Sequence, residues 1–189
     1  MIIRKGTPKD SEAIAELMFL AMGEFFYSYI NEEDANKAKQ FARYFIEQKE
    51  NQLSYENCVV AIQDHQIIAS LNIYDGGKLK ELQQPIVDYI KRHYNPEFVL
   101  GDETQAGEYY IDTLAIREDY QGNGLGTEML KYAIDKYVKE QNSALGLVVD
   151  KENPKAKELY LKLGFEHTDY RVLAGRPVEH LQKTKQLES

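Results

Sequence analysis

The sequence predicts an α/β fold of the α+β type, with a mixed central sheet of about six or seven strands flanked by about four helices. Short runs rich in β-branched and aromatic residues are typical of strands, and they are interspersed with segments whose apolar residues recur at helical spacing. The elements follow one another as strand, two helices, three strands with an insertion, helix, strand, helix and two strands. This order predicts a sheet that helices cover.

The first part of the chain is expected to contain one strand and two helices. Residues 1–4 are apolar enough for a first or edge strand. A helix is expected to begin at Thr7, because a hydroxyl cap is followed by proline and then by an acid three residues after the cap. This helix runs into the aromatic segment 25–30, whose rings either pack in the core or line a substrate cleft, and their spacing favours the core. A second helix is expected over residues 33–49.

The middle of the chain combines a hairpin with an insertion. Residues 57–62 and 66–74 read as strands that turn at Asp64 and His65. The insertion, residues 75–107, carries apolar residues at helical spacing that Pro85 interrupts, and then a loop. Insertions of this length in a compact domain are usually functional or mobile. The remaining strands and helices are expected at 109–116, 125–138, 144–149, 154–163, 165–173 and 178–183.

A glycine-rich turn joins the apolar strand 109–116 to the helix that begins at Leu125. Gly122, Gly124 and Gly126 allow a tight turn and leave no Cβ between the backbone amides and a ligand. The turn also lies at a helix N-terminus, where the macrodipole favours negative charge. In chemical terms it is a phosphate site, although a turn without a ligand is the plain alternative. The lysine nucleotide loop does not fit, since no Gly-Lys followed by a hydroxyl residue occurs at this turn. The dinucleotide fingerprint does not fit either, because Thr127 stands where its last glycine should be.

Two motifs resemble those of the GNAT acetyltransferase superfamily. Gln121, Gly124 and Gly126 match its Gln/Arg-x-x-Gly-x-Gly/Ala pyrophosphate loop position by position, and Asn153-Pro154 through Gly164-Phe165 is similar to its second CoA-side motif. The two motifs span residues 111–165, in the family's order and at its separation. The resemblance implies the GNAT fold, in which the strands carrying Leu114 and Leu147 splay apart to admit the pantetheine arm of acetyl-CoA.

Composition narrows the class of protein. The 189 residues suit one domain, 1–189, with a sizeable core, and the formal charge of −8 argues against non-specific nucleic-acid binding. No apolar run reaches the length of a membrane helix and no signal peptide precedes the first strand, so we expect no membrane partner. The single cysteine, Cys58, fits a reducing cytoplasm. The sequence leaves a monomer and a homodimer both open.

The resemblance implies acetyl-CoA as the cofactor and assigns residues to it. The amides of the glycine turn would bind the pyrophosphate, and the strand end would present backbone groups to the pantetheine arm and the thioester carbonyl. Asn153 would meet the pantetheine or hold the splayed strands, and its plain role is a helix N-cap. The expected cofactor-binding residues are Leu114, Ala115, Ile116, Gln121, Gly122, Asn123, Gly124, Leu125, Gly126, Thr127, Asn153, Lys155 and Tyr160.

Tyr160 is the expected general acid, since a phenol stays protonated at neutral pH and its position matches the family's tyrosine. The plain alternative is that it only fills the buried face of its helix. Glu108, Tyr110 and Asp112 alternate onto one strand face, and Tyr110 stands where some relatives have a glutamate base. Asp112, nearest the acetyl end, is the first choice as general base, directly or through water, although it could equally only hold the acceptor's ammonium, and Glu108 is a second catalytic carboxylate. The scattered histidines give no metal-ligand spacing.

The expected activity is direct transfer of an acetyl group to a primary amine of a small molecule or peptide. The substrate-binding residues would be Phe25, Phe26, Tyr29, Tyr110 and Asp112, and the insertion would form a lid or wall over the acceptor. Acidic residues beside aromatic rings favour a cationic acceptor such as a polyamine or a lysine-like amine. The alternatives are a non-catalytic acyl-CoA sensor with the same fold and, less in keeping with the motif order, a dinucleotide oxidoreductase.

Overall fold

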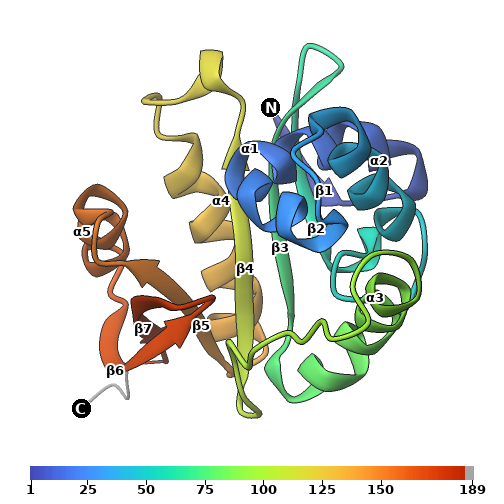
Figure 1. Ribbon diagram of the computed structural model, residues 1–189. Coiled ribbons are helices and arrows are strands. Elements are labelled where there is room, and N and C mark those ends of the chain that lie inside the picture. The colour runs from blue at the N-terminus through green and yellow to red at the C-terminus, as the bar shows by residue number, and fades with distance from the viewer. Residues whose placement is uncertain (186–189) are drawn as a thin grey trace. The chain divides into compact units, whose positions relative to one another are not determined.

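The computed structural model describes residues 1–185, which form seven strands and five α-helices (Figure 1). One sheet contains the strands in the order β1-β2-β3-β4-β5-β7-β6. β4 and β5 are parallel, whereas the pairs β1–β2, β2–β3, β5–β7 and β6–β7 are antiparallel. The predicted mixed α+β fold is thus confirmed. The elements are β1 (Ile2–Lys5), α1 (Ser11–Ile30), α2 (Ala35–Ile46), β2 (Cys58–Gln63), β3 (Gln66–Asp75), α3 (Leu79–His93), β4 (Glu108–Ile116), α4 (Leu125–Ala133), β5 (Ala144–Asp150), α5 (Pro154–Lys162), β6 (Glu166–Leu173) and β7 (Arg176–Lys183).

Contacts divide the chain into two compact units. Strand β4 begins in unit 2 and ends in unit 1, and the insertion 75–107 is likewise shared between the units. The single domain expected over 1–189 stays a prediction. Unit 1 consists of Met1–Ile73, Lys80–Leu100 and Thr113–Leu125, and unit 2 of Tyr74–Leu79, Gly101–Asp112 and the chain from Gly126 onward.

The core of unit 1 lies between its helices and strand β2. Apolar side chains of α1, α2 and α3 pack there with Cys58 and Val60 of β2. Pro8–Ile30 is long and apolar enough to cross a membrane by length and composition. Ile14 and Met18 of this segment are fully buried in the core of unit 1, so its apolar character already has a packing role.

The start of α1 follows the predicted signal. A turn of 3-10 helix, Pro8–Asp10, precedes α1, and the Asp10 carboxylate accepts hydrogen bonds from the amide and the hydroxyl of Thr7, both at 2.8 Å. Arg4 of β1 adds a two-point contact to the same carboxylate, at 2.7 and 2.9 Å. The hydrogen bonds from Arg4 lower the pKa of Asp10 to about 2. The capping box therefore also fastens the first strand to the first helix.

The insertion begins with a helix that belongs to the core. Ile86 and Ile90 of α3 are almost fully buried, and Tyr89 packs edge-on against Phe45 of α2, with ring centroids 5.3 Å apart. The predicted interruption at Pro85 is wrong, because α3 continues through it. A proline removes one backbone hydrogen bond, and in α3 the apolar face against α2 compensates for that loss.

In unit 2, β4 and β5 pair from Glu108 and Ala144 to Ile111 and Leu147, and β5 pairs in turn with β7. The helix predicted over 125–138 changes form part-way, since α4 ends at Ala133 and seven π-helical residues, Ile134–Glu140, follow. Periodicity could not predict this change, because the apolar spacing stays close to helical across it.

Candidate functional site

The glycine turn after β4 is exposed and its amides are free. Gly122 and Gly124 have φ angles of +77° and +81°, which L side chains rarely adopt, and a Cβ at either position would meet no atom within 4 Å. Among residues 1–185, the amides of Gly122, Asn123 and Gly124 have no hydrogen-bond partner. Helix α4 begins at the next residue, Leu125. Open space, free donors and a helix N-terminus together fit a bound pyrophosphate.

Side chains at the end of β4 hold the turn in place. The Gln121 side-chain amide donates to the Ile116 carbonyl at 2.9 Å, and Arg117 bonds to Asp119 at 2.7 Å and to Gln66 of β3 at 2.6 Å. Gln121 thus acts on the turn through its side chain. This bond closes the loop back onto the strand.

The other cofactor residues predicted on β4 and α4 differ in exposure. Ala115 and Leu125 are buried, whereas Leu114, Ile116, Gly126 and Thr127 are half-buried. A cofactor could therefore contact Leu114, Ile116, Gly126 and Thr127 without any change in this structure.

Helix α5 carries the second motif. The Asn153 side chain accepts a hydrogen bond from the Ala156 amide at 3.2 Å, so it serves as the helix N-cap, and Lys155 is exposed. Tyr160 is half-buried, with its ring 5.9 Å from that of Phe165. Burial raises the pKa of Tyr160, and its hydroxyl bonds to no other residue in 1–185. A protonated phenol with a free hydroxyl is suited to donating a proton to a ligand.

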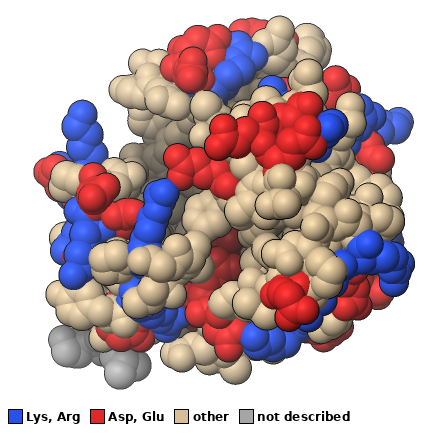
Figure 2. All heavy atoms as spheres, viewed as in Figure 1, with Lys and Arg blue, Asp and Glu red and all other residues tan. Residues whose placement is uncertain are grey.

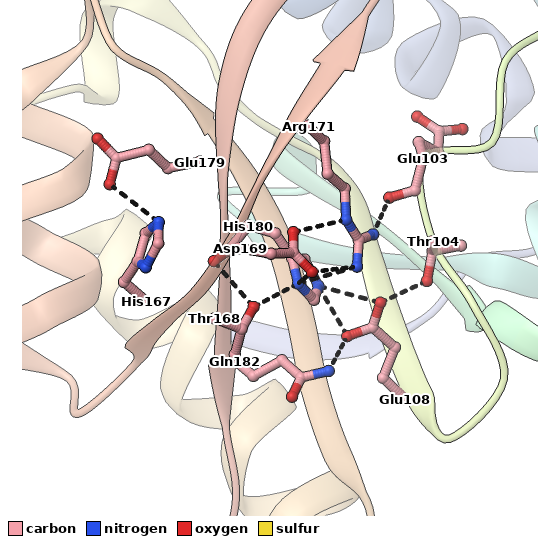
Figure 3. Close-up of polar contacts among 10 residues, drawn as sticks. All are labelled: Glu103, Thr104, Glu108, His167, Thr168, Asp169, Arg171, Glu179, His180 and Gln182. Atoms are coloured by element: carbon pink, nitrogen blue, oxygen red, sulfur yellow. Dashed lines mark hydrogen bonds and ion pairs between the residues drawn. The ribbon is translucent and has the colours of Figure 1, made fainter.

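Glu108, predicted as a catalytic carboxylate, instead occupies a buried polar cluster (Figure 3). His180 of β7 approaches its two oxygens at 2.9 and 3.1 Å, Gln182 donates to one at 2.6 Å, and Thr104 donates to the other at 2.6 Å. The side chains of Glu108 and His180 are 0% and 1% exposed. Burial raises the pKa of Glu108, but these bonds, first that of His180, outweigh it, and the pKa lies below its usual range.

The cluster extends to β6 through the second ring nitrogen of His180. Thr168 lies 2.6 Å and an Arg171 Nη 3.1 Å from Nδ1 (Figure 3). A guanidinium can only donate, so Nδ1 accepts and the ring proton sits on Nε2, facing Glu108. Arg171 also bonds to the Asp169 carboxylate at 2.9 Å and to the Glu103 carbonyl at 2.7 Å. With every oxygen of Glu108 engaged and buried, the geometry argues against its direct contact with substrate.

Tyr110 lies beside Tyr74, which in turn bonds to Glu103, and the sequence singled out neither Tyr74 nor Glu103. The Tyr74 hydroxyl donates to Glu103 at 3.2 Å, and the rings of Tyr74 and Tyr110 are 5.8 Å apart. Burial, and then the carboxylates of Asp112 and Glu103, raise the pKa of both tyrosines well above the usual value. Asp112 is half-buried, so it alone of the two predicted catalytic carboxylates keeps some exposure.

The aromatic segment of α1 divides between core and surface. Phe26 is 0% exposed and packs against Tyr29 and Phe41, which favours the core alternative for it, and its place in a substrate site stays a prediction. Phe25 and Tyr29 are half-buried and keep some accessible surface. Beside them, at the end of α1, lies a hollow of about 530 Å³ lined by Tyr27, Ser28, Asn31 and the acidic Glu24, Glu32 and Glu33. Figure 2 shows acidic side chains gathered over this part of α1.

Sequence reasoning missed the partners of Glu108. One signal was present, because Gly146 interrupts the apolar run of β5 without any turn to explain it. A Cβ at Gly146 would overlap the Glu108 carboxylate, so the glycine provides the space into which that side chain folds. In the described chain, residues 1–185, no group of three or more His, Cys, Asp and Glu side chains could hold a metal ion.

Comparison with known proteins now places the chain. The profile of the Acetyltransferase (GNAT) family matches residues 19–165, and no curated protein matches. A crystal structure described only as an acetyltransferase shares 24% identity and superposes with a TM-score of 0.83, covering 97% of this chain and 99% of its own. An N-acetyltransferase from Staphylococcus aureus Mu50 shares 20% identity with a TM-score of 0.82, covering 97% and 100%. Because the family profile spans most of the sequence, both motifs included, the chain belongs to the GNAT acetyltransferase family.

Proposed function

We propose that the protein is an acetyl-CoA-dependent N-acetyltransferase that acetylates a primary amine of a small molecule or peptide by direct transfer. The observation that carries this proposal is the exposed glycine turn, whose three free amides precede α4 where a pyrophosphate would bind. Gly122 and Gly124 adopt a backbone conformation that other residues rarely adopt, and the space above them is open, so a ligand can approach the amides closely.

Acetyl-CoA, when bound, supplies the acetyl group as a thioester and leaves as the free thiol. The turn amides would hold its diphosphate, and backbone groups of Leu114 and Ile116 would face its arm and its carbonyl. The Ile116 carbonyl already accepts a bond from Gln121, so this end of the strand is tied to the turn that would hold the diphosphate.

Two side chains would move protons. Tyr160 would donate its proton to the sulfur as the thioester bond breaks, and its raised pKa keeps that proton in place at neutral pH. Asp112 would take a proton from the amine, directly or through a water molecule, because it keeps exposed surface. Glu108 would act only by supporting this part of unit 2.

The test is release of CoA and formation of acetylated product with a panel of amines, with the product detected by mass. Acetylated product that depends on both acetyl-CoA and an amine would support the proposal. A folded protein that binds CoA but forms no product with any amine would favour the alternative, a sensor that binds acyl-CoA without turnover. We also expect a cytoplasmic enzyme, since the one cysteine, Cys58, is buried and forms no disulfide.

A further inference from the structure

Three side chains of the polar cluster around Glu108 form a series of hydrogen bonds that ends at a hydroxyl group. The Thr168 hydroxyl oxygen lies 2.6 Å from Nδ1 of His180, and Nε2 of the same ring lies 2.9 Å from the Glu108 carboxylate (Figure 3). The three residues come from the neighbouring strands β6, β7 and β4 of unit 2. A hydroxyl, an imidazole and a carboxylate joined in this order are the groups that activate a nucleophile in many enzymes.

The hydrogen bonds fix the direction of each proton in the series. Arg171 lies 3.1 Å from Nδ1, and a guanidinium only donates, so Nδ1 carries no hydrogen. The 2.6 Å contact between Thr168 and Nδ1 is therefore made with the hydroxyl proton, for which the His180 carbonyl, at 3.1 Å, is the more distant acceptor. The ring proton lies on Nε2 and faces Glu108, which fixes the tautomer in which Nδ1 is the base.

Thr168 is the exposed end of the series, and the groups behind it are closed to solvent. Thr168 is exposed, whereas the side chains of His180 and Glu108 are 1% and 0% exposed. The register of β6 against β7 shifts between His167 and Asp169, and Thr168 is the extra residue without a partner there. Bulges of this kind redirect a side chain and are common next to active sites. A reagent in solution can thus reach the hydroxyl but not the ring.

The charges around His180 favour a proton on its ring as the hydroxyl reacts. Glu108 at 2.9 Å and Asp169, 3.7 Å from Nδ1, stabilise a positive ring, and Arg171 opposes it. Arg171 is itself paired with Asp169 at 2.9 Å, which offsets its charge. Because Arg171 and Thr168 both contact Nδ1, the guanidinium also lies close to the oxygen of a carbonyl that reacts at Thr168, where it can stabilise negative charge.

We propose that Thr168 is a nucleophile that takes up the acyl group of a small activated ester, with His180 as its general base and Glu108 as the residue that positions the ring. The Thr168 oxygen attacks the ester carbonyl, and the hydroxyl proton passes to Nδ1. The bond between the carbonyl carbon and the leaving oxygen then breaks, and that oxygen takes the proton from Nδ1. The products are an ester on Thr168 and a free alcohol or phenol. The reaction uses neither the glycine turn nor acetyl-CoA, so the inference is independent of the proposed function.

The experiment treats the protein with p-nitrophenyl acetate and follows acetylation at each residue by peptide mass mapping. Hydroxylamine removes an acetyl ester from a hydroxyl group but not an acetyl amide from lysine, so the two products can be told apart. We expect acetylation of Thr168 to be at least about tenfold faster than that of Ser28, an exposed hydroxyl that donates to the Phe25 carbonyl. Mapping is needed because exposed histidines such as His65 release p-nitrophenol by themselves.

Three variants test the roles of the nucleophile and the base. Thr168→Ser keeps the hydroxyl and lacks the neighbouring methyl group, so it should be acetylated at least as fast as the wild type. Glu108→Gln removes the charge that stabilises the protonated ring and should slow acetylation of Thr168 at least about tenfold, measured below its melting temperature. His167→Ala removes the half-exposed imidazole one residue away and should change the rate less than about twofold.

Equal rates of acetylation at Thr168 and Ser28 in the wild type would overturn the inference. A folded Glu108→Gln variant that reacts at Thr168 as fast as the wild type would do the same, because a hydroxyl that only bridges β6 and β7 does not depend on that charge. A tenfold loss in His167→Ala would assign the base to the wrong histidine and would also overturn it.

Discussion

His180→Ala should destabilise the protein strongly, because it removes the main partner of a buried carboxylate. Glu108 and His180 are 0% and 1% exposed, so solvent cannot replace the lost bond. A hydrogen bond to a charged group contributes about 1.5–3 kcal/mol, and the vacated ring volume adds about 1–2 kcal/mol. The sum, about 2.5–5 kcal/mol, is comparable with the cost of leaving a buried charge without its partner. At about 2–4 °C per kcal/mol for a chain of this length, the melting temperature should fall by about 5–20 °C.

The assay is thermal and urea unfolding of wild type and variants, with His167→Ala as the matched control. His167 lies on the adjacent strand β6, its side chain is 35% exposed, and its nearest acid, Glu179, is 3.9 Å away, so its removal should cost less than about 1 kcal/mol. A double-mutant cycle with Glu108→Gln should show strong non-additivity, since the two residues share one interaction. A His180→Ala variant that melts within about 2 °C of wild type would refute the reasoning.

The pH dependence of the free energy of unfolding is a second test of the cluster around Glu108. The folded-state pKa of Glu108 is lowered below its unfolded value of about 4.3, so the unfolded chain binds the proton more readily. The stabilisation is therefore fully present above pH of about 4.3 and is lost as the pH falls through the lowered value. The stability difference between wild type and Glu108→Gln should shrink over that acid range and stay constant above it. A difference that grows on acidification would contradict the assigned direction.

Further predictions concern the glycine turn, the proposed acid Tyr160, the proposed base Asp112, and Asp10 at the start of α1. Gly124→Asp should weaken acetyl-CoA binding at least about 100-fold by calorimetry, with Gly124→Ala as the control for backbone strain, because only the aspartate brings charge to the phosphate site. Tyr160→Phe should lower kcat about 10–1000-fold with little change in acetyl-CoA affinity; wild-type turnover would leave the ring as packing. Asp112→Asn should lower kcat/KM for amines and leave CoA binding intact, and unchanged kinetics would exclude it as the base. Asp10→Asn should cost about 1–2 kcal/mol in urea unfolding at neutral pH and less as the pH falls toward about 2, where wild-type Asp10 itself protonates.

The fold could be predicted from the sequence because its signals are local. Each strand and helix leaves a pattern within its own segment, and the two motifs fix the turn before α4 and the cap of α5. The Thr7–Asp10 signal was confirmed for the same reason, since its partners are three residues apart. Pro85 misled the prediction, because its local penalty is outweighed by the packing of α3 on α2, which no single segment reveals.

The buried cluster could not be predicted in this way. Glu108 meets His180 and Gln182 across 72 and 74 residues of chain, and the alternation along β4 says only which face it shares, not what lies opposite. The same limit applies to Glu103, which reaches Tyr74 across 29 residues from a loop without regular structure. Long-range pairs of polar residues depend on strand order and loop conformation, and neither leaves a periodic pattern.

A buried carboxylate such as Glu108 needs a reason beyond stability, because apolar side chains of similar size often serve a core as well or better. What an apolar residue cannot do is hold several segments at fixed distances. Glu108 bonds to the loop through Thr104 and to β7 through His180 and Gln182, and His180 continues to Arg171, which holds the loop again at Glu103. The loop is thereby attached at two adjacent residues to one network, so Glu103 cannot shift without breaking a bond to a buried group. Such a network can cost stability, and what it provides in return is a fixed position of the loop relative to β7.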